Sequence, residues 1–327
     1  MSRILRQREL ALLLVIVVFA LGVGLVNSNF LAPATLIRTV NSSVVLMVVA
    51  IGVTAVILTR NIDVSVGATL GLTAAVTATL VTEGWSMWLV IPFSLGLGFL
   101  LGGINGIGVA YVRIPAIVMT LGTLGAYRGI QFLYTDGKSI EGIIGSFKAL
   151  ASYKLFDVPM FVGLAILLVA LAHLALTRTR QGRWFYAVGD NVTGAHLVGI
   201  PTRRVTALAF AISGLMAALG GIIFAAQIGF VTNQAGLGLE IRAIAACVIG
   251  GVSLLGGIGS VVGAGMGAVL LTMITTSLLF LRIPGFWSDA VIGSILIAVL
   301  LMDARVRSLV TKRSQELRAR QEEARTA

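Results

Sequence analysis

The sequence contains little charge, one cysteine and two histidines. Asp, Glu, Lys and Arg make up 11% of its 327 residues, whereas they make up about a quarter of a soluble domain. This composition argues against a water-soluble fold. The single cysteine, Cys247, excludes an intrachain disulfide and a cysteine metal cluster, and its apolar surroundings predict a small buried side chain.

Motifs of common hydrolases are also missing. The histidines are His173 and His196, so the sequence has no H-E-x-x-H zinc motif. "DVSVG" is not a nucleophile elbow, because Asp63 stands where G-x-S-x-G requires glycine. "GKS" at 137–139 is not a phosphate-binding loop, because Phe132 occupies the first glycine position. We therefore predict no catalytic residue, no metal site and no cofactor in this chain, which cannot hydrolyse ATP itself.

Long uncharged stretches make up most of the sequence. Residues 10–37, 84–112, 205–239 and 243–281 contain no Asp, Glu, Lys or Arg, and a helix needs about 20 such residues to cross a bilayer. The stretches are continuous and do not alternate with period two, which favours helices over barrel strands. The sequence predicts an all-α, polytopic transmembrane helical bundle of about ten spans. The predicted spans are 10–26, 40–59, 64–82, 88–112, 115–134, 158–177, 205–226, 240–255, 260–281 and 286–302.

An even number of spans places both ends of the chain on one side of the membrane. The ends and alternate loops on that side hold 17 of the 24 Lys and Arg residues. Because cytoplasmic loops carry the excess of Lys and Arg, both termini are predicted to be cytoplasmic. The net charge of +11 then needs no nucleic-acid partner. The basic tail, 304–327, is predicted to be a solvated helix that contacts anionic membrane lipid.

The stretch 243–281 is barely long enough for two full crossings and a turn. "GGVSLLGGIGS", residues 250–260, divides it, so at least one of the two helices is predicted to be short or broken. Irregular backbone at membrane depth is tolerated only against protein or beside a watery cavity, which makes this segment a candidate part of a transport pathway. An ordinary tight glycine turn between two tilted helices is the alternative.

The long inner loop, 178–204, is predicted to contain a short helix at about 191–198. Asp190 or Asn191 can cap its start, Gly199 can adopt the left-handed conformation at its end, and Pro201 prevents continuation. We expect this helix to lie across the membrane surface and to present apolar side chains to a groove on another protein; the alternative is a stable re-entry of the chain. The apolar side chains are Ala195, Leu197 and Val198, and His196 is expected at the surface.

Four segments carry a resemblance to a known family. They are "NIDVSVGATLGL" (61–72), "GGINGIGVAYVRIPAIVMTLGTLGAYRGI" (102–130), "GRWFYAVGDNVTGAHLVGI" (182–200) and "EIRAIAACVIGGVSLLGGIGSVVGAGMGAVL" (240–270). In this order and spacing they resemble the membrane-spanning subunits of bacterial ABC importers for sugars of the ribose, xylose and rhamnose type. Other phrases, such as "GKSIEG" and "LRIPGFWSDAV", resemble the autoinducer-2 branch of this family, although rhamnose permeases share several of them.

The resemblance implies an import machine in the bacterial inner membrane, with residues 1–327 as a single transmembrane domain. The implied partners are cytoplasmic ATP-binding subunits, which hold ATP and Mg²⁺, a second similar permease chain, a binding protein outside the membrane, and lipid. The implied solute is a small polyhydroxylated ring. Residues that match the family's coupling helix to the ATPase are Asp190, Asn191, Gly194, Ala195, His196, Leu197 and Gly199.

Polar residues near the predicted spans are the remaining candidates. Asn61, Asp63 and Ser65 form a short polar turn at the inner membrane face, which either caps the next helix or contacts the gate or the ATPase as it moves. A second set either lines the pathway or bonds to neighbouring helices. This set contains Asn105, Thr120, Thr123, Gln227, Asn233 and Gln234.

Three classes of function stay open at this stage. An ABC permease requires a separate ATPase. A secondary transporter or channel would need a buried ionisable group, and the predicted spans place none near their centres. A structural membrane subunit would leave uptake intact when it is deleted.

Overall fold

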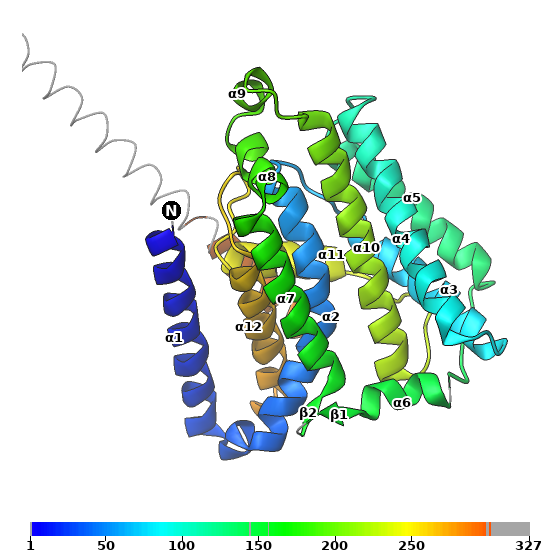
Figure 1. The fold of residues 1–327 in the computed structure, drawn as a ribbon. Helices are drawn as coiled ribbons and strands as arrows, with labels where there is room; N and C mark the ends of the chain where they lie inside the picture. The colour runs from blue at the N-terminus through cyan, green and yellow to red at the C-terminus, as the bar shows by residue number, and fades with distance from the viewer. Residues whose placement is uncertain (1, 144, 156, 299–300, 302–327) are drawn as a thin grey trace, which may run out of the picture.

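The computed structural model describes residues 2–143, 145–155, 157–298 and 301. These residues form a bundle of apolar helices (Figure 1), which confirms the predicted helical class in its coarse form. The longer helices are α1 (Ser2–Val26), α2 (Pro33–Leu58), α3 (Val66–Thr82), α4 (Met87–Ala110), α5 (Ala116–Tyr134), α7 (Met160–Arg178), α10 (Thr202–Ile228) and α12 (Val261–Phe280). The shorter elements are η1 (Ser28–Leu31), α6 (Ser146–Ser152), α8 (Arg180–Asp190), α9 (Val192–Leu197), α11 (Leu239–Ile249) and the hairpin of β1 (Lys154–Leu155) with β2 (Val158–Pro159).

Different elements lie at the two ends of the bundle. Figure 1 places α9 and the N-terminal end of α1 at one end, and α6 with the β1–β2 hairpin at the other. The sequence predicted both α9 and the N-terminus on the cytoplasmic side, and their position at the same end fits that prediction. The tail 304–327, predicted as a basic helix, lies outside the described residues.

Six helices in the described part of the chain are long and apolar enough to cross a membrane, namely α1 from Glu9, α2, α4, α7, α10 and α12. Each of the ten predicted spans contains a helix, but α3 has 17 residues and the helix Trp287–Ala298 is shorter still. The eleven residues of α11 reach about 17 Å at 1.5 Å per residue, which is less than a hydrocarbon core of about 30 Å. The number of full crossings therefore stays a prediction.

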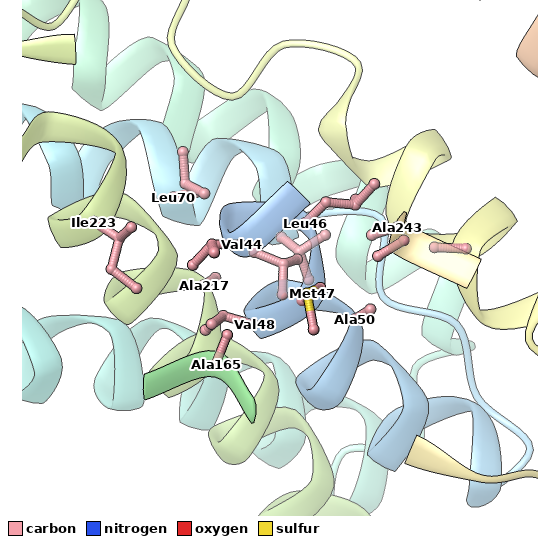
Figure 2. Packing of buried hydrophobic residues seen from close by; sticks show 14 of the residues in the cluster. Val44, Leu46, Met47, Val48, Ala50, Leu70, Ala165, Ala217, Ile223 and Ala243 are labelled. Atoms are coloured by element: carbon pink, nitrogen blue, oxygen red, sulfur yellow. The ribbon is translucent and has the colours of Figure 1, made fainter. Parts of the chain in front are cut away.

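Helix α2 lies at the centre of the bundle. Its sequence from Val44 to Leu58 is apolar around its whole circumference, which is typical of a helix enclosed by other helices. It contacts α7, α8, α10, α11 and α12, and 78% of its apolar window is buried, against 11% for α1. Figure 2 shows Val44, Met47 and Val48 of α2 among side chains of the surrounding helices. The labelled neighbours are Leu70, Ala165, Ala217, Ile223 and Ala243.

Helices α4 and α10 pack with their backbones in contact. Gly98, Gly102 and Gly106 recur every fourth residue on α4 and face α10. A β-carbon at Gly102 would collide with the Phe210 carbonyl oxygen and lie 2.9 Å from the Gly214 nitrogen. Small residues at this spacing let membrane helices approach closely, so this contact depends on the absence of side chains.

The glycine contact predicts a position-specific loss of stability. Replacing Gly102 with Val should lower the unfolding temperature in detergent, because overpacking of this kind costs about 1–3 kcal/mol. Gly103→Val is the matched control, since a β-carbon at Gly103 meets nothing within 4 Å. Equal unfolding temperatures for the two variants would contradict the proposed packing.

Candidate coupling and pathway site

The predicted inner helix is present as α9. Asn191 caps it by accepting a hydrogen bond from the Gly194 nitrogen at 2.9 Å, and Gly199 follows with a φ of 81°. Local side-chain chemistry therefore fixed this helix, as the sequence indicated. Asp190 does not cap it and ends α8, a helix that the sequence analysis missed. Thr179 caps α8 by accepting a hydrogen bond from the Gly182 nitrogen at 2.9 Å. This threonine was the signal in the sequence that could have predicted the start of α8.

The exposed face of α9 is apolar at its end. Leu197 is 81% exposed and Val198 is 76% exposed, so both can enter a groove on another protein. His196 is exposed, as expected. The expectation for Ala195 was wrong: it is 5% exposed and packs in a cluster with Val205 and Phe185 of the neighbouring helices.

Helix α8 packs closely against the glycine-rich segment 250–260. A β-carbon at Gly189, in the last turn of α8, would collide with the Leu58 carbonyl oxygen and lie 2.5 Å from the Gly257 nitrogen. The Gly257 nitrogen donates to the same Leu58 oxygen at 3.0 Å. The Tyr186 hydroxyl donates to the Gly259 oxygen at 3.2 Å, and burial raises the pKa of Tyr186 to about 12, so it stays a neutral donor at physiological pH. The end of α2, the end of α8 and this segment thus form one contact.

The prediction of a short or broken helix within 243–281 is confirmed. Helix α11 ends at Ile249, residues 250–260 are not helical, and α12 starts at Val261. Gly251, Gly256 and Gly257 have positive φ angles of 83°, 81° and 71°, a conformation that side chains disfavour. The segment therefore lies against α2 and α8, in agreement with irregular backbone being tolerated where protein covers it.

A second irregular segment, 229–238, precedes α11. It falls in the connection between the predicted spans 205–226 and 240–255, but its packing inside the bundle was not predicted. Val231 pairs with Ile140 of the connection after α5. The Gln131 amide nitrogen donates to the carbonyl oxygens of Thr232 and Asn233 at 3.5 and 3.3 Å. Side chains thus satisfy backbone groups that a helix would have paired internally. The glycines at 229, 236 and 238 were the available signal.

Segment 229–238 ends against the start of α3. A β-carbon at Gly236 would collide with the Gly67 carbonyl oxygen, and one at Gly71 would collide with the Ala235 oxygen. Together, the two irregular segments and α11 form a continuous stretch, 229–260. This stretch runs from the connection after α5 to the contact with α8.

Asp63 lies at the centre of a buried hydrogen-bond network. One of its carboxylate oxygens accepts from the Ser65 nitrogen at 2.9 Å and the Ser65 hydroxyl at 2.6 Å, and the other accepts from the Ser213 hydroxyl of α10 at 2.9 Å. The Asn105 amide of α4 donates to the Ser65 hydroxyl oxygen at 2.8 Å. The Thr123 hydroxyl of α5 donates to the Asn105 oxygen at 2.7 Å. Residues from two of the predicted sets therefore meet in one network that joins four helices.

The expected position of this turn was partly wrong. Asp63 is 1% exposed, so it cannot touch an ATPase at the membrane face. Ser65 occupies the position before α3, but its side chain makes no capping bond; Asp63 accepts from the Ser65 nitrogen in its place. Asn61 bonds to Thr59 and takes no part in the cap. The carboxyl oxygens of Asp63 therefore join helices by hydrogen bonds in addition to ordering the local turn.

The other pathway candidates lie in different parts of the bundle and have different hydrogen-bond partners. Thr120 donates to the Ala116 and Ile62 carbonyl oxygens at 2.8 and 3.4 Å. Gln227 donates to the Asn41 carbonyl oxygen at 3.2 Å, and Asn233 donates to the Gly137 oxygen at 2.9 Å. Each of these groups bonds to a neighbouring segment, whereas Gln234 is exposed. A role in lining the pathway stays a prediction for all of them.

Charged groups lie deeper in the bundle than the sequence analysis stated. Arg128 lies within α5, and Glu240 and Arg242 lie in α11. The expectation that no span carries a charge near its centre was wrong for the predicted span 115–134, because Arg128 lies within its helix. Within the described ranges, no three His, Cys, Asp or Glu side chains come together as metal ligands.

An apolar groove of about 360 Å³ lies beside α8. Its lining comes from α2, α7, α8 and α10 and includes Ile51, Leu171, Phe185 and Met216. A polyhydroxylated ring needs hydrogen-bond partners wherever it binds. The groove offers few, so it does not fit such a solute.

Comparisons with known proteins identify a transport family. Residues 35–300 match the family model described as "Branched-chain amino acid transport system / permease component". The chain is 47% identical over 301 residues to the autoinducer 2 import system permease protein LsrC of Escherichia coli O9:H4 (strain HS), which covers 92% of this chain and 88% of that protein. It is 46% identical over 320 residues to LsrC of Enterobacter sp. (strain 638), covering 97% and 93%. No solved structure matches the chain.

The Asp63 network predicts a stability effect that is separate from transport. Asp63→Ala should lower the free energy of unfolding by about 1–3 kcal/mol, because Ser213 and the Ser65 nitrogen would lose their buried acceptor. Thermal unfolding in detergent measures this loss. Glu83→Ala, at an exposed position, is the control and should stay within about 0.5 kcal/mol of the unmodified protein. If both variants unfold alike, the network contributes nothing.

Proposed function

The chain belongs to the permease-component family of branched-chain amino acid transport systems, and on that basis we propose that it forms the membrane pathway of an ATP-driven importer for autoinducer-2, a sugar-like furanosyl ligand. It is a multi-pass membrane permease with several apolar helices of spanning length. The names of its close relatives, autoinducer 2 import system permease proteins, supply the solute. Coverage of about nine-tenths of those relatives, with one family model over 35–300, supports a single transmembrane domain.

One observation carries the coupling role of the inner loop. Leu197 and Val198 project from the end of a short, capped helix that follows α8, and the last turn of α8 packs against the end of α2 and the segment 250–260. Exposed apolar side chains on a rigid base suit docking in a groove. The partners in this proposal are cytoplasmic ATP-binding subunits, a second similar permease chain and an external binding protein. ATP and Mg²⁺ bind to the ATPase, and this chain performs no bond chemistry.

The backbone contacts of α8 provide a route by which the ATPase moves the pathway. A displacement of α9 is passed by α8 to residues 250–260, because Gly189 and Gly257 leave no space between these backbones. Segment 250–260 is joined to the C-terminal end of α11, and the N-terminal end of α11 is joined to segment 229–238. The pathway therefore opens and closes through the broken stretch 229–260, while the Asp63 network keeps α3, α4, α5 and α10 together. This mechanism couples two sites through one contiguous element.

A rhamnose or ribose permease is the second candidate. Its support is the set of sequence phrases shared with rhamnose permeases, and much of the selectivity is expected in the binding protein. A transporter without ATP coupling requires a buried ionisable group, and Arg128 and Glu240 are candidates for that group. Membership of a permease-component family argues against this class of function.

The coupling proposal predicts a loss of stimulated ATP hydrolysis. In the complete complex, Leu197→Asp should leave the chain in the membrane and reduce solute-stimulated hydrolysis by at least about tenfold, because an apolar contact is replaced by a buried charge. Leu197→Met, which conserves volume, should keep near-normal stimulation. Full stimulation in Leu197→Asp would remove the coupling role. The buried Ala195 is a poorer target, because its substitution also disturbs the packing.

The solute proposal predicts selective uptake. Vesicles that contain the complete importer and its cognate binding protein should accumulate labelled autoinducer-2 in preference to labelled ribose and rhamnose, and only with ATP. Preferred uptake of rhamnose or ribose would select the second candidate. Uptake that continues without ATP would contradict both.

A further inference from the structure

Arg128 of α5 and Glu240 of α11 carry opposite charges that do not form an ion pair. The ion pairs within 4.0 Å among the described residues are Lys138 with Asp136 and Arg242 with Asp289. Arg128 uses one guanidinium nitrogen, Nη1, to donate to the Ala235 carbonyl oxygen at 2.6 Å and to the Gln131 amide oxygen at 3.4 Å. The guanidinium is thereby fixed against segment 229–238.

Several polar atoms of this pair are buried without a partner. Arg128 Nε, Arg128 Nη2 and Glu240 Oε2 have no hydrogen bond within the part of the chain that the structure describes. Leaving a buried charged group unpaired costs free energy, and the cost is higher than for a neutral group. Such groups in membrane proteins mark solute pathways. The unused donors and the unused acceptor therefore need an explanation beyond folding.

The carboxylate of Glu240 is packed against the backbone at the start of α3. A β-carbon at Gly67 would collide with Glu240 Oε2, so only a glycine at the start of α3 lets the carboxylate take this position. Segment 229–238, whose backbone is not helical, lies beside it through the contact of Gly236 with Gly67. The donors of Arg128 and the acceptor of Glu240 thus lie where the broken stretch meets α3.

We propose that Arg128 and Glu240 form a subsite that binds adjacent hydroxyl groups of the solute on its way through the membrane. The guanidinium donates from Nε and Nη2 to hydroxyl oxygens, and Glu240 Oε2 accepts from a hydroxyl hydrogen. This subsite rests on the proposed function, because it assumes a polyhydroxylated ring as the solute.

The chemistry of the pair distinguishes among solutes. A hydroxyl group both donates and accepts, so neighbouring hydroxyls satisfy an arginine and a carboxylate together. A phosphate would be repelled by Glu240, and a cation would be repelled by Arg128. Hydrogen bonds to charged groups are the stronger ones, which gives the subsite discrimination against analogues that lack a hydroxyl.

The test combines protein variants with solute analogues. Transport is measured in vesicles with the complete complex for autoinducer-2 and for analogues that each lack one ring hydroxyl. With the unmodified protein, the critical deoxy analogue should show a KM raised by about tenfold or more, as expected for the loss of a charged hydrogen bond. Arg128→Gln and Glu240→Gln should each raise the KM for autoinducer-2 by a similar factor.

The decisive result is the combination of the two changes. In Glu240→Gln or Arg128→Gln, the deoxy analogue should be transported with nearly the same KM as autoinducer-2, because the hydroxyl has already lost its partner. The deoxy penalty is the factor by which loss of the hydroxyl raises the KM. If the two residues had a purely structural role, this penalty would be as large in the variants as in the unmodified protein, and that result overturns the subsite. Lys138→Gln, which removes an exposed charge, is the matched control and should preserve both the KM and the deoxy penalty.

Failure of the proposed function gives a different pattern. If the unmodified complex transports ribose or rhamnose in place of autoinducer-2, the same cycle is run with deoxy forms of that sugar, and it tests the subsite independently. If the unmodified complex transports leucine, and both variants abolish that uptake, the pair binds the charged ends of an amino acid and the hydroxyl subsite is wrong.

Discussion

The structure depends most on the place where three backbone segments meet without side chains between them. At this place Gly189 of α8 and Gly257 of the segment 250–260 lie against the Leu58 carbonyl oxygen at the end of α2. Any β-carbon at Gly189 would separate these segments, so their contact is steric as well as hydrogen-bonded. Because α8 leads into α9 and Gly257 leads back into α11, this contact joins the surface helix to the interior of the bundle.

The interior shows a division between fixed and irregular parts. The Asp63 network and the glycine contact between α4 and α10 hold α3, α4, α5 and α10 together. The stretch 229–260 lacks the continuous internal hydrogen bonds of a long helix and is held by side chains from its neighbours. Changes of conformation are concentrated where backbone bonding is least regular. A permease that works by gating fits this division.

The sequence predicted the features that local chemistry controls. Asn191 and Gly199 determined the bounds of α9, and the glycines of 250–260 indicated a broken helix, because capping and positive φ angles depend on a few adjacent residues. Features that depend on distant partners were missed. The depth of Asp63 is set by Ser213 and Asn105, and the position of segment 229–238 is set by Gln131. Likewise, Ala195 is buried by residues of other helices that no nearby pattern specifies.

The most direct measurement follows distances in the complete complex during ATP turnover. Spin labels are placed at Arg183 of α8, at Leu255 of the segment 250–260 and at Tyr153 at the opposite end of the bundle, all of which are exposed, while the native Cys247 is buried and escapes labelling. We expect the distance from 183 to 255 to stay constant when ATP binds, while the distance from 255 to 153 changes. A changing distance from 183 to 255, or a constant distance from 255 to 153 throughout turnover, would contradict this expectation.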